Sequence, residues 1–128
     1  MSNGVFIFVD DEYSRPLYAD PDPDEVDSEL FDAIRESITD AIEEEGGAKG
    51  SRTVGEVRYS WNTHLKSGLS FVAFAEDLPR RRLDRYLKLV SQRYFDEVDD
   101  VRSPDRAGVE DVVVDVIPPW EETDEELD

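Results

Sequence analysis

Residues 69–75 read LSFVAFA, the most strand-like run in the chain. Aromatic and β-branched residues favour extended backbone, and an almost unbroken apolar run suits a strand inside a sheet. We therefore expect this segment to be a central strand. A turn at residues 66–68 (KSG) precedes it, and residues 76–79 (EDLP) follow it as the start of a helix.

Other segments also carry strand patterns. Residues 4–9 (GVFIFV) form an apolar run, and residues 15–19 (RPLYA) are a second strand after a short polar turn. Between residues 54 and 65 apolar and polar side chains alternate, which is the period of a half-buried strand. Residues 48–53 are small and polar, so we expect a flexible link there. Residues 109–117 are dense in β-branched side chains and predict a last strand.

Two segments have the apolar spacing of amphipathic helices. The first begins with Asp22 as its cap and Pro23 in its first turn, and the pair Gly46-Gly47 ends it. Its apolar stripe consists of Val26, Leu30, Phe31, Ile34, Ile38 and Ile42. The second helix follows residues 76–79, and its stripe consists of Leu83, Tyr86, Leu87, Val90, Tyr94 and Phe95.

These elements predict a single α+β domain at residues 1–120, with an acidic disordered tail at residues 121–128. The expected architecture is a two-layer sandwich in which two long amphipathic helices cover one face of a mostly antiparallel sheet. The order is β-β-α-β-β-α-β, with residues 54–65 as one strand or two. We expect one core that buries Leu30, Ile34, Ile38, Phe71, Ala73, Leu83, Leu87 and Val90 together.

Composition excludes several classes of function. The 128 residues include no Cys and one His (His64), so thiolate metal sites, cysteine nucleophiles and multi-histidine centres are excluded. A net charge of −19 argues against a broad nucleic-acid interface. No apolar run is long enough for a membrane span and no basic leader is present, so we expect a cytoplasmic protein. We find no catalytic motif and predict no catalytic, cofactor-binding or metal residues and no enzymatic activity.

The charge is divided into three blocks. Residues 1–46 carry a net charge of −13, residues 47–93 carry +6, and residues 94–128 carry −12. Three explanations stay open. In the first, folding brings the acidic and basic blocks together as complementary surfaces. In the second, the basic block is a binding site for a partner. In the third, the acidity is an adaptation to a salt-rich cytoplasm, in which salt screens the negative charge.

Four arginines stand at the start of the second helix, where positive charge opposes the helix dipole. Either neighbouring carboxylates at Glu76, Asp77 and Asp84 compensate them, or they face outward to a phosphate-bearing ligand, to a partner or to a second copy of this chain. Trp120 lies between two prolines and the acidic tail, and it either caps the core or anchors an interface. The candidate partner-binding residues are Arg80, Arg81, Arg82, Arg85 and Trp120.

The order of elements resembles that of longin and roadblock-like domains, which are associated with small GTPases. The segment KSGLSFVAFAED (residues 66–77) is the most longin-like part, because a glycine turn, a buried strand and an acidic helix start come in that order. The matching stretches are residues 5–9, 17–19, 26–42, 57–75 and 83–95. Two features differ from the longin pattern: the helices enclose two strands instead of three if residues 54–65 are undivided, and the C-terminal segment has a strand pattern where longins continue with a helix.

The resemblance implies a non-catalytic regulator without cofactor. Such domains bind a small GTPase or trafficking, polarity or motility machinery, often as dimers. Two alternatives from other classes stay open. One is a small acidic inhibitor, such as an immunity protein, which its charge steers to a basic toxin or nuclease. The other is a regulatory domain that holds a small molecule in an apolar pocket between sheet and helices.

Overall fold

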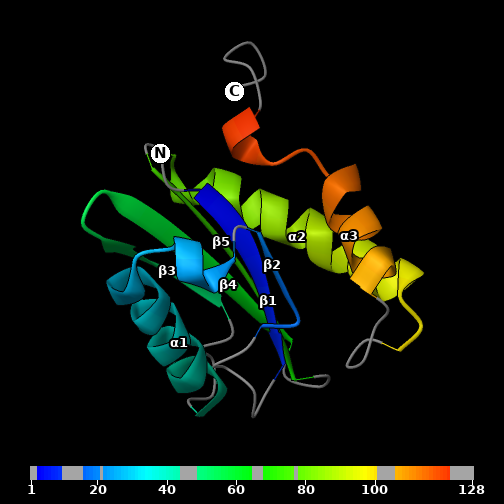
Figure 1. The fold of residues 1–128 in the computed structure, drawn as a ribbon, viewed down its shortest axis with the longest axis horizontal. Helices are drawn as coiled ribbons and strands as arrows, with labels where there is room; N and C mark the ends of the chain where they lie inside the picture. The colour runs from blue at the N-terminus through cyan, green and yellow to red at the C-terminus, as the bar shows by residue number, and fades with distance from the viewer. Residues whose placement is uncertain are drawn as a thin grey trace.

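The computed structural model describes residues 3–9, 16–20, 22–43, 49–64, 68–76, 78–100 and 106–121. Within these ranges the chain forms a five-stranded sheet and three α-helices (Figure 1). The strands are β1 (Asn3–Val9), β2 (Tyr18–Asp20), β3 (Lys49–Val54), β4 (Val57–His64) and β5 (Leu69–Glu76). The helices are α1 (Ser28–Glu43), α2 (Arg80–Glu97) and α3 (Arg106–Asp115), with short 3-10 turns η1 (Pro23–Glu25) and η2 (Pro119–Glu121). The α+β class is confirmed.

The central strand is β5, as predicted. The sheet order is β2-β1-β5-β4-β3, and every neighbouring pair is antiparallel. All seven residues from Leu69 to Ala75 are buried. A strand that is apolar at successive positions presents apolar side chains to both faces of the sheet, so both faces must be covered.

Helices cover both faces, and the expectation of two helices on one face is wrong. Helix α1 packs against one face, and α2 and α3 pack against the other (Figure 1). The reason lies in β1 and β5, because both of their alternating sets of side chains are apolar. The eight predicted core residues are all buried, but they divide between two cores. Leu30, Ile34 and Ile38 belong to the α1 side, and Phe71, Ala73, Leu83, Leu87 and Val90 belong to the α2 side.

The start of α1 differs from the prediction. The sequence predicts Asp22 as the cap, but Asp22 precedes the turn η1, where its backbone N–H donates a hydrogen bond to Glu25 (3.3 Å). Asp27 is the cap of the helix itself, because its Oδ1 accepts the N–H of Glu29 at 3.0 Å. The predicted helix end at Gly46-Gly47 lies outside the described residues.

One buried hydrogen-bonded group fastens α1 to the sheet. The hydroxyls of Ser37 on α1 and Tyr59 on β4 are 2.8 Å apart, and the Tyr59 hydroxyl also lies 3.3 Å from the carbonyl oxygen of Ala33. Phe31 adds an edge-on contact with Phe6 of β1, at 5.6 Å between ring centroids. Partnered hydroxyls cost little to bury, and they set the position of the helix along the sheet.

Residues 49–54 form the edge strand β3, where the sequence predicted a flexible link. Its residues are polar because they lie at the rim of the sheet, where charged side chains such as Lys49 and Arg52 are typical. Gly50 pairs directly with Trp61 of β4, and the indole lies across it. A β-carbon at Gly50 would overlap the indole ring, at 2.7 Å from its Cη2. The Trp61 ring can therefore lie over residue 50 only because glycine has no side chain there.

This contact predicts that Gly50→Ala destabilises the fold by about 1–3 kcal/mol, because the Trp61 ring must move. The substitution should cost much less in a Trp61→Ala background, where the ring is absent. Urea denaturation of both single variants and the double variant measures this coupling, with Thr53→Ala at an exposed β3 position as the control. Equal costs of Gly50→Ala in the two backgrounds would contradict the prediction.

Residues 106–115 form helix α3, and the strand predicted at residues 109–117 is wrong. The buried side chains are Val109, Val112, Val113 and Val116, a spacing of three and four that belongs to a helix. Val114 between them is 70% exposed. The β-branched content obscured this spacing, because valine favours strands unless packing decides otherwise. Of the predicted tail, Glu121 belongs to η2 and residues 122–128 lie outside the described ranges.

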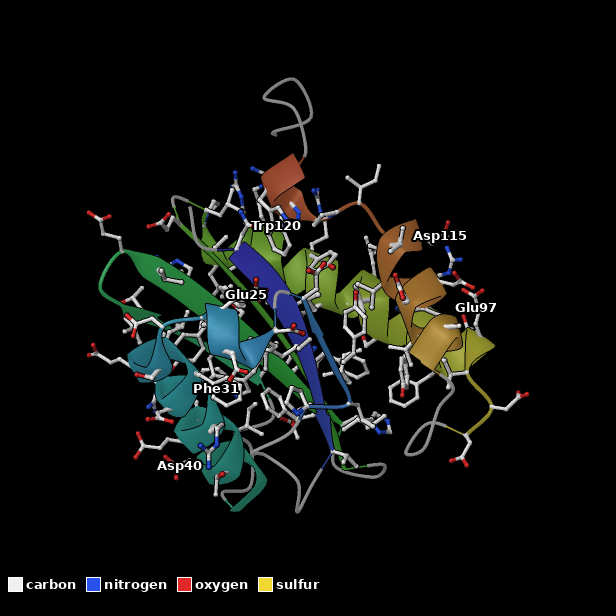
Figure 2. All side chains as sticks on the ribbon, in the orientation of Figure 1. Glu25, Phe31, Asp40, Glu97, Asp115 and Trp120 are labelled. Atoms are coloured by element: carbon white, nitrogen blue, oxygen red, sulfur yellow. The ribbon has the colours of Figure 1, made fainter. Side chains whose placement is uncertain are left out.

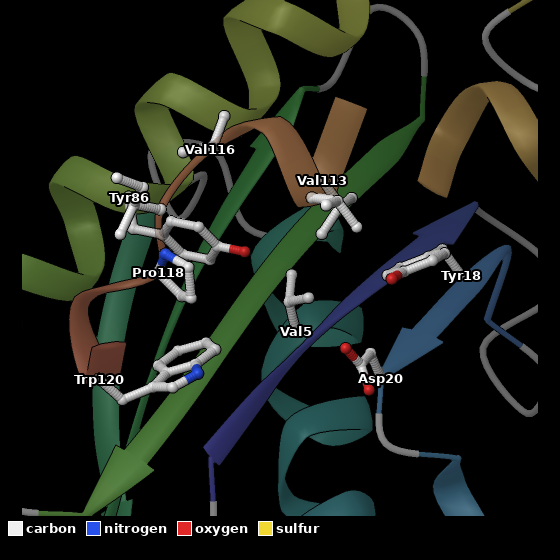
Figure 3. A pocket seen from close by; sticks show the side chains of 10 residues that line it. Val5, Tyr18, Asp20, Tyr86, Val113, Val116, Pro118 and Trp120 are labelled. Carbon is white, nitrogen blue, oxygen red and sulfur yellow. The ribbon is translucent and has the colours of Figure 1, made fainter. Parts of the chain in front are cut away.

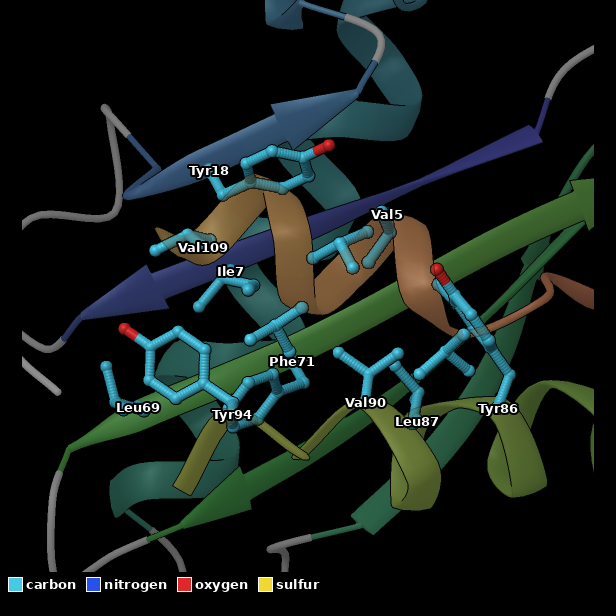
Figure 4. Packing of buried hydrophobic residues seen from close by; sticks show 14 of the residues in the cluster. Val5, Ile7, Tyr18, Leu69, Phe71, Tyr86, Leu87, Val90, Tyr94 and Val109 are labelled. Carbon is cyan, nitrogen blue, oxygen red and sulfur yellow. The ribbon is translucent and has the colours of Figure 1, made fainter. Parts of the chain in front are cut away.

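Tyr94 is completely buried in the core between α2 and the sheet (Figure 4). Its ring meets the ring of Phe71 edge-on, at 5.4 Å between centroids. Burial, with a smaller effect from the charge of Asp100, raises the pKa of Tyr94 from 10.0 to about 12. The folded protein therefore keeps this proton at a pH where the unfolded chain releases it.

Alkaline pH should weaken the fold through Tyr94. Its contribution to stability is complete below pH 10 and is lost as the pH rises toward 12, because only the unfolded state releases the proton in that window. The slope for one proton is about 1.4 kcal/mol per pH unit. Tyr94→Phe keeps the ring and removes this slope, which urea unfolding across the window measures. A constant difference between variant and wild type throughout the window would refute the assignment.

Candidate functional site

Three of the four candidate arginines lie on the exposed surface of α2. Arg80, Arg81 and Arg85 are exposed, and Arg80 pairs with Asp84 one turn later at 3.1 Å. The helix begins after Pro79, without a side-chain cap and with no acidic residue in its first turn. Glu76 is the last residue of β5, four residues before the helix begins, and Asp77 lies outside the described residues. Arg80, Arg81 and Arg85 are therefore at the surface, and for Arg80 the pair with Asp84 is the compensation that the sequence left open as one of two alternatives.

Arg82 does not belong to that surface. It is 8% exposed, and its Nη2 donates a hydrogen bond to the carbonyl oxygen of Pro119 at 3.0 Å. The bond joins the first turn of α2 to η2, which lies 37 residues later in the chain. Arg82 is therefore a structural residue that holds the C-terminal segment against α2. Its prediction as a partner-binding residue is corrected.

Trp120 is held by the same junction. It is partly buried against the α2-side core, and its ring meets the Tyr86 ring edge-on, with 5.5 Å between centroids and 69° between planes. Of the two roles left open, capping the core is therefore present in the structure. Because Arg82 bonds to Pro119, the residue before Trp120, the indole lies beside the start of α2, and Figure 2 shows nitrogen atoms of side chains around the Trp120 label.

A cleft that sequence analysis did not predict opens beside Trp120. It has a volume of about 260 Å³ and lies between β1 and β2, the side chain of Tyr86, and the segment from α3 to η2 (Figure 3). Its lining residues are Val5, Tyr18, Asp20, Tyr86, Val113, Val114, Val116, Ile117, Pro118 and Trp120. No local signal could reveal it, because its walls come from segments about a hundred residues apart.

The outer side of α1 and the turn before it are acidic. Exposed carboxylates follow one another there, and Figure 2 shows their oxygen atoms along the helix up to Asp40. They are Asp24, Glu25, Asp27, Glu29, Asp32, Glu36 and Asp40. Arg35 lies among them, 3.4 Å from Asp32, and its guanidinium stacks over the Phe31 ring. The molecule therefore presents an acidic α1 surface and a basic α2 start on opposite sides of the sheet.

Arg93 connects the basic middle block to the acidic C-terminal block. Its guanidinium pairs with Glu97 at 2.6 Å and with Asp115 at the end of α3. These hydrogen bonds raise the pKa of Arg93 above its ordinary value, because they stabilise the charged form. At Arg93 the basic and acidic blocks therefore pair with each other within the fold. Complementary folding of the blocks was one of the three explanations left open by the sequence.

Comparison with known proteins identifies no relative. No protein-family model matches the chain, and no curated protein is significantly similar to it in sequence. None of the described helices is long and apolar enough to cross a bilayer. The described residues also contain no group of three or more His, Cys, Asp or Glu side chains placed to hold a metal ion. The function is therefore inferred from the surfaces and the fold.

Replacing Arg82 should loosen the C-terminal segment. Arg82→Met removes a buried hydrogen bond from a charged donor, which costs about 2 kcal/mol, and it releases η2 with Trp120. We expect a lower unfolding midpoint in urea, a red shift of tryptophan emission and stronger quenching by acrylamide. Arg81→Met at the exposed neighbouring position is the matched control and should leave the emission unchanged. Identical emission spectra for Arg82→Met and wild type would disprove this role.

Proposed function

We propose that this chain is a non-enzymatic interaction module of longin/roadblock type that binds a small GTPase or a component of polarity, motility or trafficking machinery. The observation that carries the proposal is the arrangement of elements. Three strands separate α1 from α2, and a further helix follows α2, so both sequence differences from the longin pattern are removed. Among the described residues the order is two strands, a helix, three strands and two helices, and this order supports the proposal.

The basic start of α2 is the proposed contact surface. Arg80, Arg81 and Arg85 project from the first turns of the helix, where their charge is locally unfavourable. Arg82 and Trp120 hold the adjoining η2 against the same helix. An acidic patch on the partner would complement this exposed positive surface, and steering by opposite charge would accelerate association.

A second candidate function is supported by the acidic α1 surface. A row of carboxylates on the outer side of one helix is the kind of surface by which a small acidic inhibitor would occupy a basic site on a toxin or nuclease. The two candidates therefore use opposite sides of the sheet. This separation makes them distinguishable by paired substitutions.

The test uses two charge-reversed variants in affinity purification from the native host. Arg81→Glu/Arg85→Glu alters the basic start of α2, and Glu36→Lys/Asp40→Lys alters the acidic α1 surface; each pair is four residues apart on an exposed helix face. Both should fold, because acids suit the start of a helix and lysines suit its C-terminal half. We expect wild type to capture a small GTPase or a polarity, motility or trafficking protein, identified by mass spectrometry. The arginine variant should capture at least about tenfold less, and the α1 variant an unchanged amount.

The opposite pattern supports the inhibitor. Capture of a basic toxin or nuclease that is lost in Glu36→Lys/Asp40→Lys and kept in Arg81→Glu/Arg85→Glu would overturn the proposal. Circular dichroism and thermal melts of both variants serve as controls for folding. Repeating the capture at higher salt should weaken whichever contact is electrostatic, since exposed charges are screened.

A further inference from the structure

The cleft beside Trp120 contains a carboxylate on an otherwise apolar face. Asp20 pairs with Val5 and Tyr18 pairs with Ile7 in the antiparallel register of β1 and β2. Residues directly opposite one another in such a pair project to the same face of the sheet. Val5 and Ile7 belong to the core under α2 and α3, so Asp20 and Tyr18 project toward those helices too. Figure 3 shows the Asp20 carboxylate at the cleft, across from Trp120.

Three aromatic rings surround the same space. Tyr18 comes from β2, Tyr86 from α2 and Trp120 from η2, and Tyr86 and Trp120 meet edge-on at 5.5 Å between centroids. Aromatic faces attract cations through the ring quadrupole, and the attraction grows where water is excluded. Tyr86 and Tyr18 are buried at 3% and 8% exposure, whereas Trp120 is half-buried and Asp20 is exposed at the rim of the cleft. Among the ten residues that line the cleft, Asp20 is the one with a formal charge.

We infer that this cleft binds the cationic side chain of an arginine or lysine, flanked by apolar residues, on a partner protein. The Asp20 carboxylate would pair with the cationic head, and the three rings would surround the stem and head of the side chain. Val114 and Ile117 are 70% and 65% exposed beside the cleft, and they offer apolar contact to the flanking residues. This site lies beside the basic start of α2, and it does not depend on the identity of the partner proposed above.

Size and charge both favour this occupant. A volume of about 260 Å³ suits one long side chain, since cofactor and drug-sized ligands occupy pockets of about 300 Å³ or more. An anionic occupant would be repelled by the Asp20 carboxylate. The cation of the adjoining junction, Arg82, donates to the Pro119 carbonyl and is not among the lining residues. A purely apolar side chain would pack against the rings but make no use of the Asp20 carboxylate at the rim.

The test uses two blocked tripeptides of similar shape, one with a cationic side chain and one with a neutral side chain. The first is acetyl-Leu-Arg-Leu-amide, and in the second the arginine is replaced by citrulline, which has a similar shape and no charge. Fluorotryptophan labelling of the whole chain gives one fluorine NMR signal for Trp120 and one for Trp61, and Trp61 is the internal control because it packs against Gly50 on the other face. Asp20→Asn removes the cleft's charge, and Asp111→Asn removes an exposed charge of α3 outside the lining.

We expect the arginine peptide to shift the Trp120 signal in a saturable way, with the Trp61 signal unchanged. The citrulline peptide should bind wild type about tenfold more weakly. Asp20→Asn should bind both peptides with that weaker affinity, and Asp111→Asn should behave as wild type. Equal binding of the two peptides to wild type, undiminished binding of the arginine peptide to Asp20→Asn, or no Trp120 shift at peptide concentrations up to about 10 mM would overturn the inference. These measurements use the purified chain without a partner protein. A negative result here would overturn the inference about the cleft and leave the proposed function, which the capture experiment tests, unaffected.

Discussion

The burial of β5 on both faces is the constraint on which the rest of the structure depends. Because side chains alternate across a strand, an unbroken apolar run in the centre of a sheet demands a cover on each side. The chain meets this demand with α1 on one side and the pair α2 and α3 on the other. Each core then has its own polar attachment: the hydroxyls of Ser37 and Tyr59 for α1, and the charged contacts of Arg82 and Arg93 for the C-terminal segment.

The two covers also separate the charges of the molecule. The acidic N-terminal block supplies α1 and its outer carboxylates, whereas the basic middle block supplies the start of α2 on the far side of the sheet. Part of the basic block is neutralised internally, because Arg93 pairs with Asp115 of the acidic C-terminal block. Complementary folding and a partner surface, which the sequence leaves as alternatives, are therefore compatible: Arg93 serves the first, and the exposed arginines at the start of α2 are proposed for the second.

Local periodicity predicts much of this fold, and its failures have identifiable causes. The stripe from Leu83 to Tyr94 is a helix because its spacing and its residue types agree. In residues 109–116 spacing and residue type disagree, and packing against α2 resolves the conflict in favour of the helical spacing. Strand β3 has no apolar signal because an edge strand is held by its backbone pairing with β4. The inward turn of Arg82 and the cleft beside Trp120 both depend on contacts between distant segments, which periodicity does not contain.

The composition of the cleft has a thermodynamic consequence for the C-terminal segment. One wall belongs to the sheet, through Val5, Tyr18 and Asp20, and the facing wall belongs to α3 and η2. A state in which α3 and η2 have come away from the sheet contains no cleft. Any ligand that touches both walls binds the docked state alone, so binding and docking are linked equilibria and each shifts the other by the same free energy. Occupancy of a small cavity on one side of the molecule would in this way raise the fraction of molecules in which the last helix is docked.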